Sequence, residues 1–107
     1  MAKRRKKRYI LLTSEPQKNP DHIAKAVLTS YKKLFGIFGL ASADLRVIRN
    51  YPDKGMTILR CALDHVPRLL LAAAFVKRID SEPVALRVIT ISGTVKKIKE
   101  KIRSLQS

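Results

Sequence analysis

Four short hydrophobic stretches predict β-strands, because each is rich in branched residues and is bounded by turn-forming residues. They are residues 8–13, 45–51, 56–63 and 84–91. The second and third stretches are separated only by Pro-Asp-Lys-Gly at 52–55, which predicts a β-hairpin. The segment Ser-Glu-Pro-Gln-Lys-Asn-Pro after the first strand contains two prolines and predicts a linker.

Three further stretches predict helices, because their apolar residues recur at three- and four-residue steps. The first begins at Asn19-Pro20, a favourable pair of N-cap and first helical residue, and ends at Gly36. A non-helical connection then follows over residues 36–44. The second helix is expected at 65–79 with Asp64 as its cap, and the third at 94–105.

The predicted order β-α-β-β-α-β-α indicates one α/β (α+β) domain spanning residues 1–107, with residues 1–7 as a basic, flexible tail. The first six elements match the ferredoxin-like pattern, an antiparallel sheet sandwich with two helices on one face, and the last helix is an addition. The last strand is apolar on both sides, so both faces of the sheet should be covered. We place Val84, Leu86 and Val88 on one face of that strand, and Ala85, Ile89 and Ile91 on the other. The stripe suited to covering part of the second face is Val95, Ile98, Ile102 and Leu105.

Positive charge is the strongest compositional signal. The 107 residues include 23 Lys and Arg against 8 Asp and Glu, giving a net charge of +15. Residues 3–8 contribute +6 and residues 94–107 contribute +4, so the charge is heaviest at both termini. A domain this basic is expected to bind a polyanion, since its own charges would otherwise repel one another.

Several classes of protein are disfavoured. The single cysteine, Cys61, excludes an internal disulfide and is most simply a buried core residue. His22 and His65 have no neighbours at metal-ligand spacing, so we expect no metal site and treat both as residues near helix starts. The longest apolar run has 8 residues, and no signal peptide is evident. We therefore expect a soluble protein that binds no membrane and is cytoplasmic, or nuclear and nucleolar in a eukaryote.

No catalytic residues are predicted. The carboxylates lie mostly in turns and caps, and no nucleophile motif surrounds any serine. Small acyl-phosphate hydrolases of this fold carry a Gly- and Arg-containing loop after the first strand, which is absent here. Aromatic residues make up only 6% of the chain, so base stacking on the sheet is disfavoured. Recognition of structured RNA through its phosphates is favoured instead.

The candidate RNA-binding residues come from three regions. They are Lys3, Arg4, Arg5, Lys6, Lys7, Arg8, Lys25, Lys32, Lys33, Ser92, Gly93, Thr94, Lys96 and Lys97. The N-terminal run could instead be a localisation signal or a solubilising tail, and the lysines of the first helix could be a solvated face. Arg60 and Arg87 lie inside apolar strands, where pairing with a buried carboxylate or a position at the sheet edge is favoured over a role in RNA binding alone.

The Ser-Gly-Thr stretch at 92–94 stands between a strand and a helix, where backbone and hydroxyl groups can bind a phosphate or cap the helix. Lys96 and Lys97 follow it, and no acidic residue occurs before Glu100. A first helical turn without acidic residues suits an external anion better than a simple cap. One glycine without the Walker pattern does not indicate nucleotide hydrolysis. We favour an RNA phosphate here, with capping alone as the alternative.

Four stretches together resemble the Pop-five/Rpp-fourteen family, whose archaeal members are protein component 2 of RNase P. They are KKRYILL, GLASADLRVI (39–48), GMTILRC (55–61) and LRVITISGTVKKIK (86–99). The two most specific features are the strand ending in Arg60-Cys61 and the Ser-Gly-Thr followed by Val-Lys. The chain departs from the family after Cys61, where Ala-Leu-Asp-His-Val-Pro replaces a stretch that often carries acidic residues.

The resemblance implies a ferredoxin-like fold and a noncatalytic subunit of RNase P, which removes the 5′ leader of precursor tRNA. The implied partners are the RNase P RNA, protein component 3 and, indirectly, precursor tRNA. A homodimer within a heterotetramer is a further implied arrangement. The Mg²⁺ used in cleavage belongs to the catalytic RNA, so this chain needs no cofactor. A stand-alone or ribosome-associated RNA-binding module is the alternative, and a small hydrolase on this fold is a weaker one.

Overall fold

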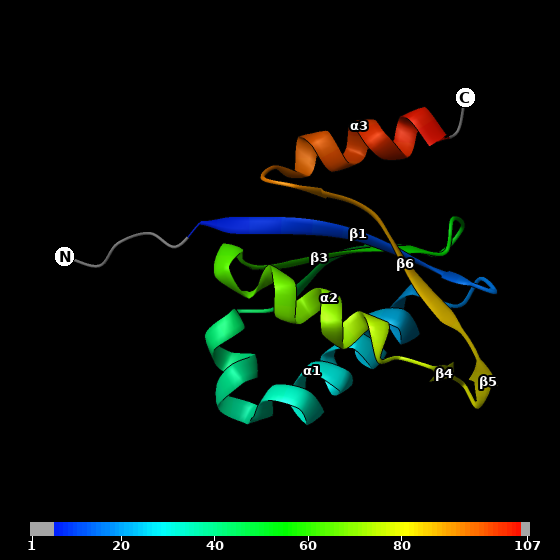
Figure 1. Ribbon diagram of the computed structural model, residues 1–107. Coiled ribbons are helices and arrows are strands. Elements are labelled where there is room, and N and C mark those ends of the chain that lie inside the picture. Colours follow the sequence, from blue (N-terminus) through cyan, green and yellow to red (C-terminus); the bar gives the residue numbers. More distant parts are fainter. Residues whose placement is uncertain (1–5, 106–107) are drawn as a thin grey trace.

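The computed structural model describes residues 6–105 and contains a four-stranded antiparallel sheet (Figure 1). Its strands are β1 (Lys7–Glu15), β2 (Arg46–Tyr51), β3 (Met56–Ala62) and β6 (Ala85–Ser92). They lie in the order β2-β3-β1-β6, so the first strand in sequence occupies a central position. All neighbouring strands are antiparallel. This arrangement confirms the predicted ferredoxin-like fold.

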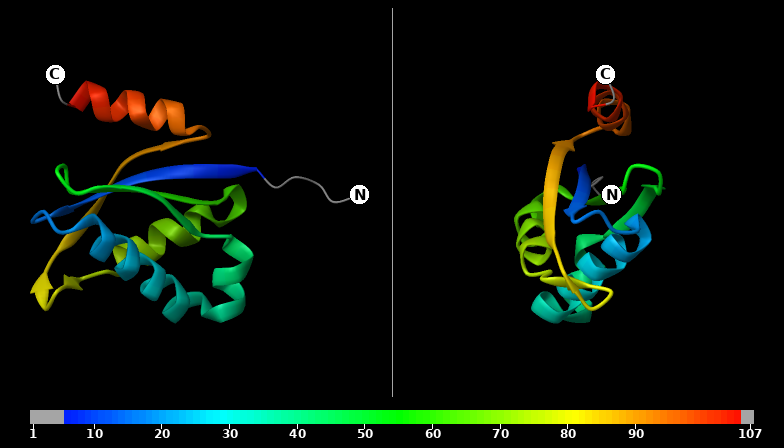
Figure 2. Two further views of the ribbon diagram at one scale, coloured as in Figure 1. Left: turned by 180° about the vertical axis from the view of Figure 1, so that it is seen from behind. Right: turned by 90° about the vertical axis from the view of Figure 1, so that its right-hand side faces the viewer.

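Two layers of helix enclose the sheet (Figure 2). Helices α1 (Pro20–Ala43) and α2 (Val66–Ala74) cover one face, and α3 (Val95–Leu105) lies on the other. Successive residues of β1 point to opposite faces, so Ile10 and Leu12 join the core under α1 and α2, whereas Leu11 joins Ile98 and Ile102 under α3. The prediction that both faces are covered is confirmed.

The helical stretch α1 is longer than predicted. Asn19 caps its start by accepting a hydrogen bond from the backbone N–H of Asp21, as expected. Gly36 does break the helical geometry, with φ 76° and ψ 177°, but helical turns resume and continue to Ala43. The predicted connection over 36–44 is therefore wrong. Ala43 is fully buried and Leu40 packs against the same core, which holds the second segment in place.

The second predicted helix is too long at its C-terminal end. A 3₁₀ turn, η1 (Leu63–His65), precedes α2, so Asp64 lies inside that turn, and the N-cap residue of α2 is His65, whose side chain makes no capping hydrogen bond. After Ala74 the chain becomes extended and forms the small hairpin of β4 (Arg78–Ile79) and β5 (Glu82–Pro83). Extension lets Val76 and Ile79 reach the core, where both are buried.

A bulge in β6 alters the predicted faces of that strand. The register between β1 and β6 shifts between Leu11 and Leu12, leaving Ile89 as the additional residue. Ile91 therefore lies opposite Ile10, on the α1 and α2 face, and not on the same face as Ile89. Because β6 is an edge strand, Val88 and Ile91 each remain 39% exposed. Leu105, the last residue of the predicted helical stripe, is also exposed.

Candidate nucleic-acid interface

The N-terminal strand and the Ser-Gly-Thr loop lie side by side. Tyr9 pairs with Ser92 in the sheet register, which places Arg8 next to the start of the loop. The Nη1 atom of Arg8 lies 3.5 Å from the position that a Cβ atom would occupy on Gly93. Segments more than 80 positions apart in sequence thus form one basic surface. We call Arg8, residues 92–94, Lys96 and Lys97 the loop surface.

Both hydroxyl groups of the loop make local hydrogen bonds. The backbone N–H of Thr94 donates to Ser92 Oγ at 3.2 Å, and the N–H of Lys97 donates to Thr94 Oγ1 at 3.3 Å. Thr94 is therefore a helix cap for α3, as the capping alternative predicted. Lys96 and Lys97 are exposed, and the first turn contains no acidic residue. The loop is a capped helix start that presents two exposed ammonium groups to an anion, and neither pairs with a carboxylate within residues 6–105.

The remaining residues predicted near the N-terminus differ in their positions. Lys3, Arg4 and Arg5 lie outside the described residues, whereas Lys6 is exposed. Lys7 is half-buried and forms an ion pair with Asp44. This pairing, together with Arg46, lowers the pKa of Asp44 to about 2. The side chain of Lys7 is thus engaged within the fold, whereas Lys6 is held through its backbone carbonyl, which accepts from the N–H of Leu63 at 2.8 Å.

The lysines of α1 belong to a different surface. Lys25, Lys32 and Lys33 are exposed on the helix layer, across the sheet from α3. Lys25 pairs with Asp21 at 3.1 Å, one helical turn earlier. Lys25 and Lys33 line a pocket beside α2, whereas Lys32 does not. The predicted residues therefore form two separate basic regions.

A third basic region was missed from the sequence. Arg46 of β2 lies opposite Arg60 of β3, and Arg60 lies opposite Tyr9, which packs against the α3 core. Residues directly opposite in adjacent strands share a face, so these side chains project to the α3 side. Arg49 of β2 lies opposite Ile58 of the same core, and its guanidinium stands 5.1 Å from the ring centre of Tyr51. We call Arg46, Arg49 and Arg60 the strand surface.

Arg46 and Arg60 lie directly opposite each other and repel, so the groups that each one contacts determine how far this repulsion is offset. Arg46 donates from Nε to Asp44 Oδ1 at 3.2 Å. Among the described residues, Arg60 pairs with no carboxylate and its buried Nε has no hydrogen-bond partner. Within the described residues Arg60 therefore has neither the predicted carboxylate partner nor the predicted edge position, because β3 lies between β2 and β1. Arg87 is exposed on the edge strand β6, which agrees with the predicted edge position.

The histidines and the cysteine have structural surroundings. His65 is buried and its Nδ1 lies 2.8 Å from the hydroxyl of Tyr31, while His22 lies 2.8 Å from Asp80. Cys61 is buried in the core, and burial raises its pKa to about 11, so its thiol is not activated. Within residues 6–105, no group of three metal-ligating side chains occurs and no helix is long and apolar enough to cross a membrane.

The sequence profile of the Rpp14/Pop5 family matches residues 8–103, nearly all of the chain. The chain belongs to the Rpp14/Pop5 family. The match includes β1 with Arg8, the strand surface and the loop surface, and the family predicted from the four sequence stretches is confirmed.

Curated archaeal relatives agree with this assignment. The chain is 32% identical over 103 residues to "Ribonuclease P protein component 2" of Pyrococcus furiosus, covering 94% of this chain and 86% of that protein. It is 35% identical over 101 residues to the protein of the same name from Methanosarcina mazei, covering 92% and 84%. A chain in the cryo-EM structure of yeast ribonuclease MRP is similar in fold, with a TM-score of 0.64, 12% identity and coverage of 97% and 96%.

Proposed function

We propose that this chain is a noncatalytic protein subunit of ribonuclease P. It binds and stabilises the catalytic RNA, together with protein component 3, for removal of the 5′ leader from precursor tRNA. The family match over residues 8–103 carries this proposal, because the relatives that share it are named as components of that enzyme. Under the proposal the chain is cytoplasmic and binds no cofactor, and the Mg²⁺ of the reaction belongs to the RNA.

The charge distribution supports binding to folded RNA. The loop surface and the strand surface both lie at the α3 side or its edge, and they present cations with few aromatic faces. Such surfaces bind phosphates and recognise shape more than sequence. Where two RNA helices approach each other, these side chains would neutralise phosphates that otherwise need Mg²⁺. The chain should therefore lower the Mg²⁺ concentration that the RNA requires.

One reconstitution tests this function. Purified RNase P RNA, component 3 and precursor tRNA are assayed for leader removal over a range of Mg²⁺ concentrations, with and without this chain. We expect the chain to shift the Mg²⁺ midpoint downward and to be inactive without the RNA. An unchanged midpoint alongside ordinary RNA binding would favour the stand-alone module, and cleavage by the protein alone would favour a hydrolase.

The surface for the protein partner is proposed at the C-terminal segment of α1. The second face of the sheet does not offer this surface, because α3 already occupies the apolar part of that face. After the break at Gly36, Ile37 is 65% exposed and Phe38 is 90% exposed. Adjacent exposed apolar side chains of this size are typical of protein interfaces. Component 3 should co-elute with the wild-type chain and not with Phe38→Ser, whereas Lys32→Gln should retain the complex.

A further inference from the structure

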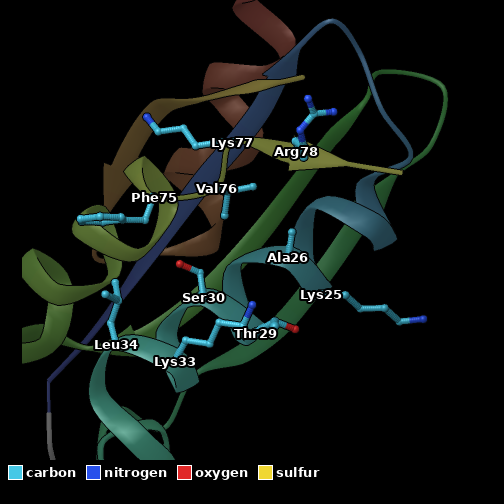
Figure 3. A pocket seen from close by; sticks show the side chains of 10 residues that line it. All are labelled: Lys25, Ala26, Thr29, Ser30, Lys33, Leu34, Phe75, Val76, Lys77 and Arg78. Carbon is cyan, nitrogen blue, oxygen red and sulfur yellow. The ribbon is translucent and has the colours of Figure 1, made fainter. Parts of the chain in front are cut away.

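A pocket of about 480 Å³ lies between α1 and the segment that follows α2 (Figure 3). Its α1 side includes Thr29, Lys33 and Leu34, and its other side includes Phe75 and Lys77. The volume is within the range of roughly 300–1,000 Å³ found for small-ligand sites. The pocket lies on the helix layer, across the sheet from α3 and the strand surface.

The rim of the pocket is cationic. Its charged lining residues are Lys25, Lys33, Lys77 and Arg78, and no carboxylate lines it. Lys25 is partly neutralised by Asp21, and Arg78 donates to the carbonyl of Ser81 at 2.9 Å. Lys33 and Lys77 form no ion pair with any residue that the structure describes. Two ammonium groups are therefore free to bind an anion.

The wall of the pocket is aromatic and apolar. Phe75 is 57% exposed and Leu34 is 39% exposed, so neither side chain is enclosed by the core that lies under α1 and α2. In Figure 3 the ring of Phe75 and the side chain of Lys77 extend to the same side. A flat ring beside a lysine can stack a nucleobase while the ammonium contacts the adjoining phosphate. Thr29, which is exposed, adds a hydroxyl-bearing side chain to the lining of the pocket.

We propose that this pocket binds one unpaired nucleotide of an RNA, with the base on Phe75 and its phosphate at Lys77, and with Lys33 on the opposite, α1 wall as the cation for an adjoining phosphate. The inference rests on the proposed RNA-binding function and adds a site for single-stranded RNA, distinct from the two surfaces for helical phosphates. Charge complementarity favours a polyanion, and the aromatic wall favours a nucleotide over phosphate alone. An acidic peptide with an apolar side chain has related chemistry and is the competing ligand in the test.

The test compares full-length variants by fluorescence anisotropy with a labelled ten-nucleotide single-stranded adenine RNA. Phe75→Leu retains apolar volume but removes the flat ring, and we expect it to weaken binding roughly tenfold, the usual effect of losing one stacked base. Lys33→Gln with Lys77→Gln should weaken binding and flatten its salt dependence. Phe38→Leu and the double variant Lys99→Gln with Lys101→Gln are the matched controls outside the pocket, and both should bind much as wild type. Urea midpoints establish that each variant is folded.

Nuclear magnetic resonance then identifies the ligand class. AMP should shift the backbone signals of Thr29 and Phe75 at lower concentration than ribose 5-phosphate or a Glu-Phe-Glu peptide does. Equal effects of the Phe75 and Phe38 variants, or tighter binding of the peptide, would overturn the pocket proposal. The Mg²⁺ assay separates this proposal from the proposed function. If the wild-type chain stimulates leader removal but AMP shifts no backbone signals, only the pocket proposal is contradicted. Stacking on Phe75 without stimulation contradicts only the RNase P role.

Discussion

Asp44 links three parts of the chain through charge. It ends α1 in the left-handed conformation with φ 50°, pairs with Lys7 of β1 and accepts from Arg46 of β2. These two cations, Lys7 first, hold its pKa at about 2, below the ordinary value of 3.8. A carboxyl group whose pKa falls on folding stabilises the folded state when it is ionised. That contribution is complete above about pH 4 and is lost as pH falls through 2.

Asp44→Asn tests this contribution, since asparagine also tolerates a left-handed backbone. We expect the variant to lose on the order of 0.5–1 kcal/mol of unfolding free energy at pH 7, because the carboxylate is about one-third exposed and partly screened. Urea unfolding at pH 7 and pH 2 measures the difference, which should shrink at the lower pH. Glu100→Gln, at an exposed position on α3, is the control. A difference independent of pH would assign the effect to the backbone.

Residue identity alone could not reveal the strand surface. Arg46, Arg49 and Arg60 are scattered in sequence, and only the β2–β3 register places Arg46 opposite Arg60. Alternation did contain a usable signal, because Arg60 follows Met56 and Ile58 at two-residue steps and therefore shares their face. The bulge at Ile89 carried no such signal, since two apolar residues in succession fit either face.

At the element scale, substitutions in and after the loop before α3 can test helix capping and phosphate binding separately. Thr94→Ala removes the hydroxyl that accepts from Lys97 N–H, so it should cost about 1 kcal/mol of stability. It should leave the salt dependence of RNA binding almost unchanged. Lys96→Ala with Lys97→Ala should do the reverse, reducing the slope of log K against log salt by about 2. Stability should be equal or slightly higher, because cations in the first turn oppose the helix dipole.

Lys99→Ala with Lys101→Ala is the matched control for that pair. Both lysines are exposed on α3, beyond its first turn. The control should reduce the salt slope less than the Lys96 and Lys97 variant does. If the Lys96 and Lys97 change instead lowers the urea midpoint while RNA affinity is retained, the loop acts only as a cap.

Gly36 determines where the second segment of α1 points. Its φ of 76° and ψ of 177° fall in a region essentially restricted to glycine, although no atom lies within 4 Å of the position that a Cβ atom would occupy. Gly36→Ala should therefore destabilise the fold by about 1–3 kcal/mol through the backbone alone. D-alanine at this position, introduced by ligation at Cys61, fits the same dihedral angles and should retain stability. Urea unfolding of both variants measures the difference, and equal loss in both would point to a steric cause.

Elements were predictable where local pattern agreed with tertiary packing. The four main strands, the Asn19 cap and the start of α3 follow from alternation and capping residues that the core reinforces. The second segment of α1 was not predictable, because glycine at position 36 ordinarily ends a helix. The hairpin of β4 and β5 was not predictable either, since Val76 and Ile79 continue a helical spacing yet reach the core from an extended chain.

At the scale of the whole molecule, net charge and exposed apolar surface have opposite effects on self-association. Two copies of a chain with net charge +15 repel, yet Ile37 and Phe38 present an apolar surface that a second copy could cover. Lys32 and Lys33 are exposed nearby on α1, so a symmetric contact there would bring like charges together. Salt weakens that repulsion, with a Debye length that falls from about 30 Å at 0.01 M to about 10 Å at 0.1 M.

The chain alone should therefore be a monomer at about 10 mM salt and should associate more strongly as salt rises, the opposite of its binding to RNA. Sedimentation velocity over a range of salt concentrations measures this dependence. Phe38→Ser should remove association at high salt, whereas Phe75→Leu should not, because Phe75 lies at the pocket beside α2. A dimer that is stable at the lowest salt would contradict a charge-limited contact. Component 3 should then bind at low salt only if its interface supplies the acidic groups that a second copy lacks.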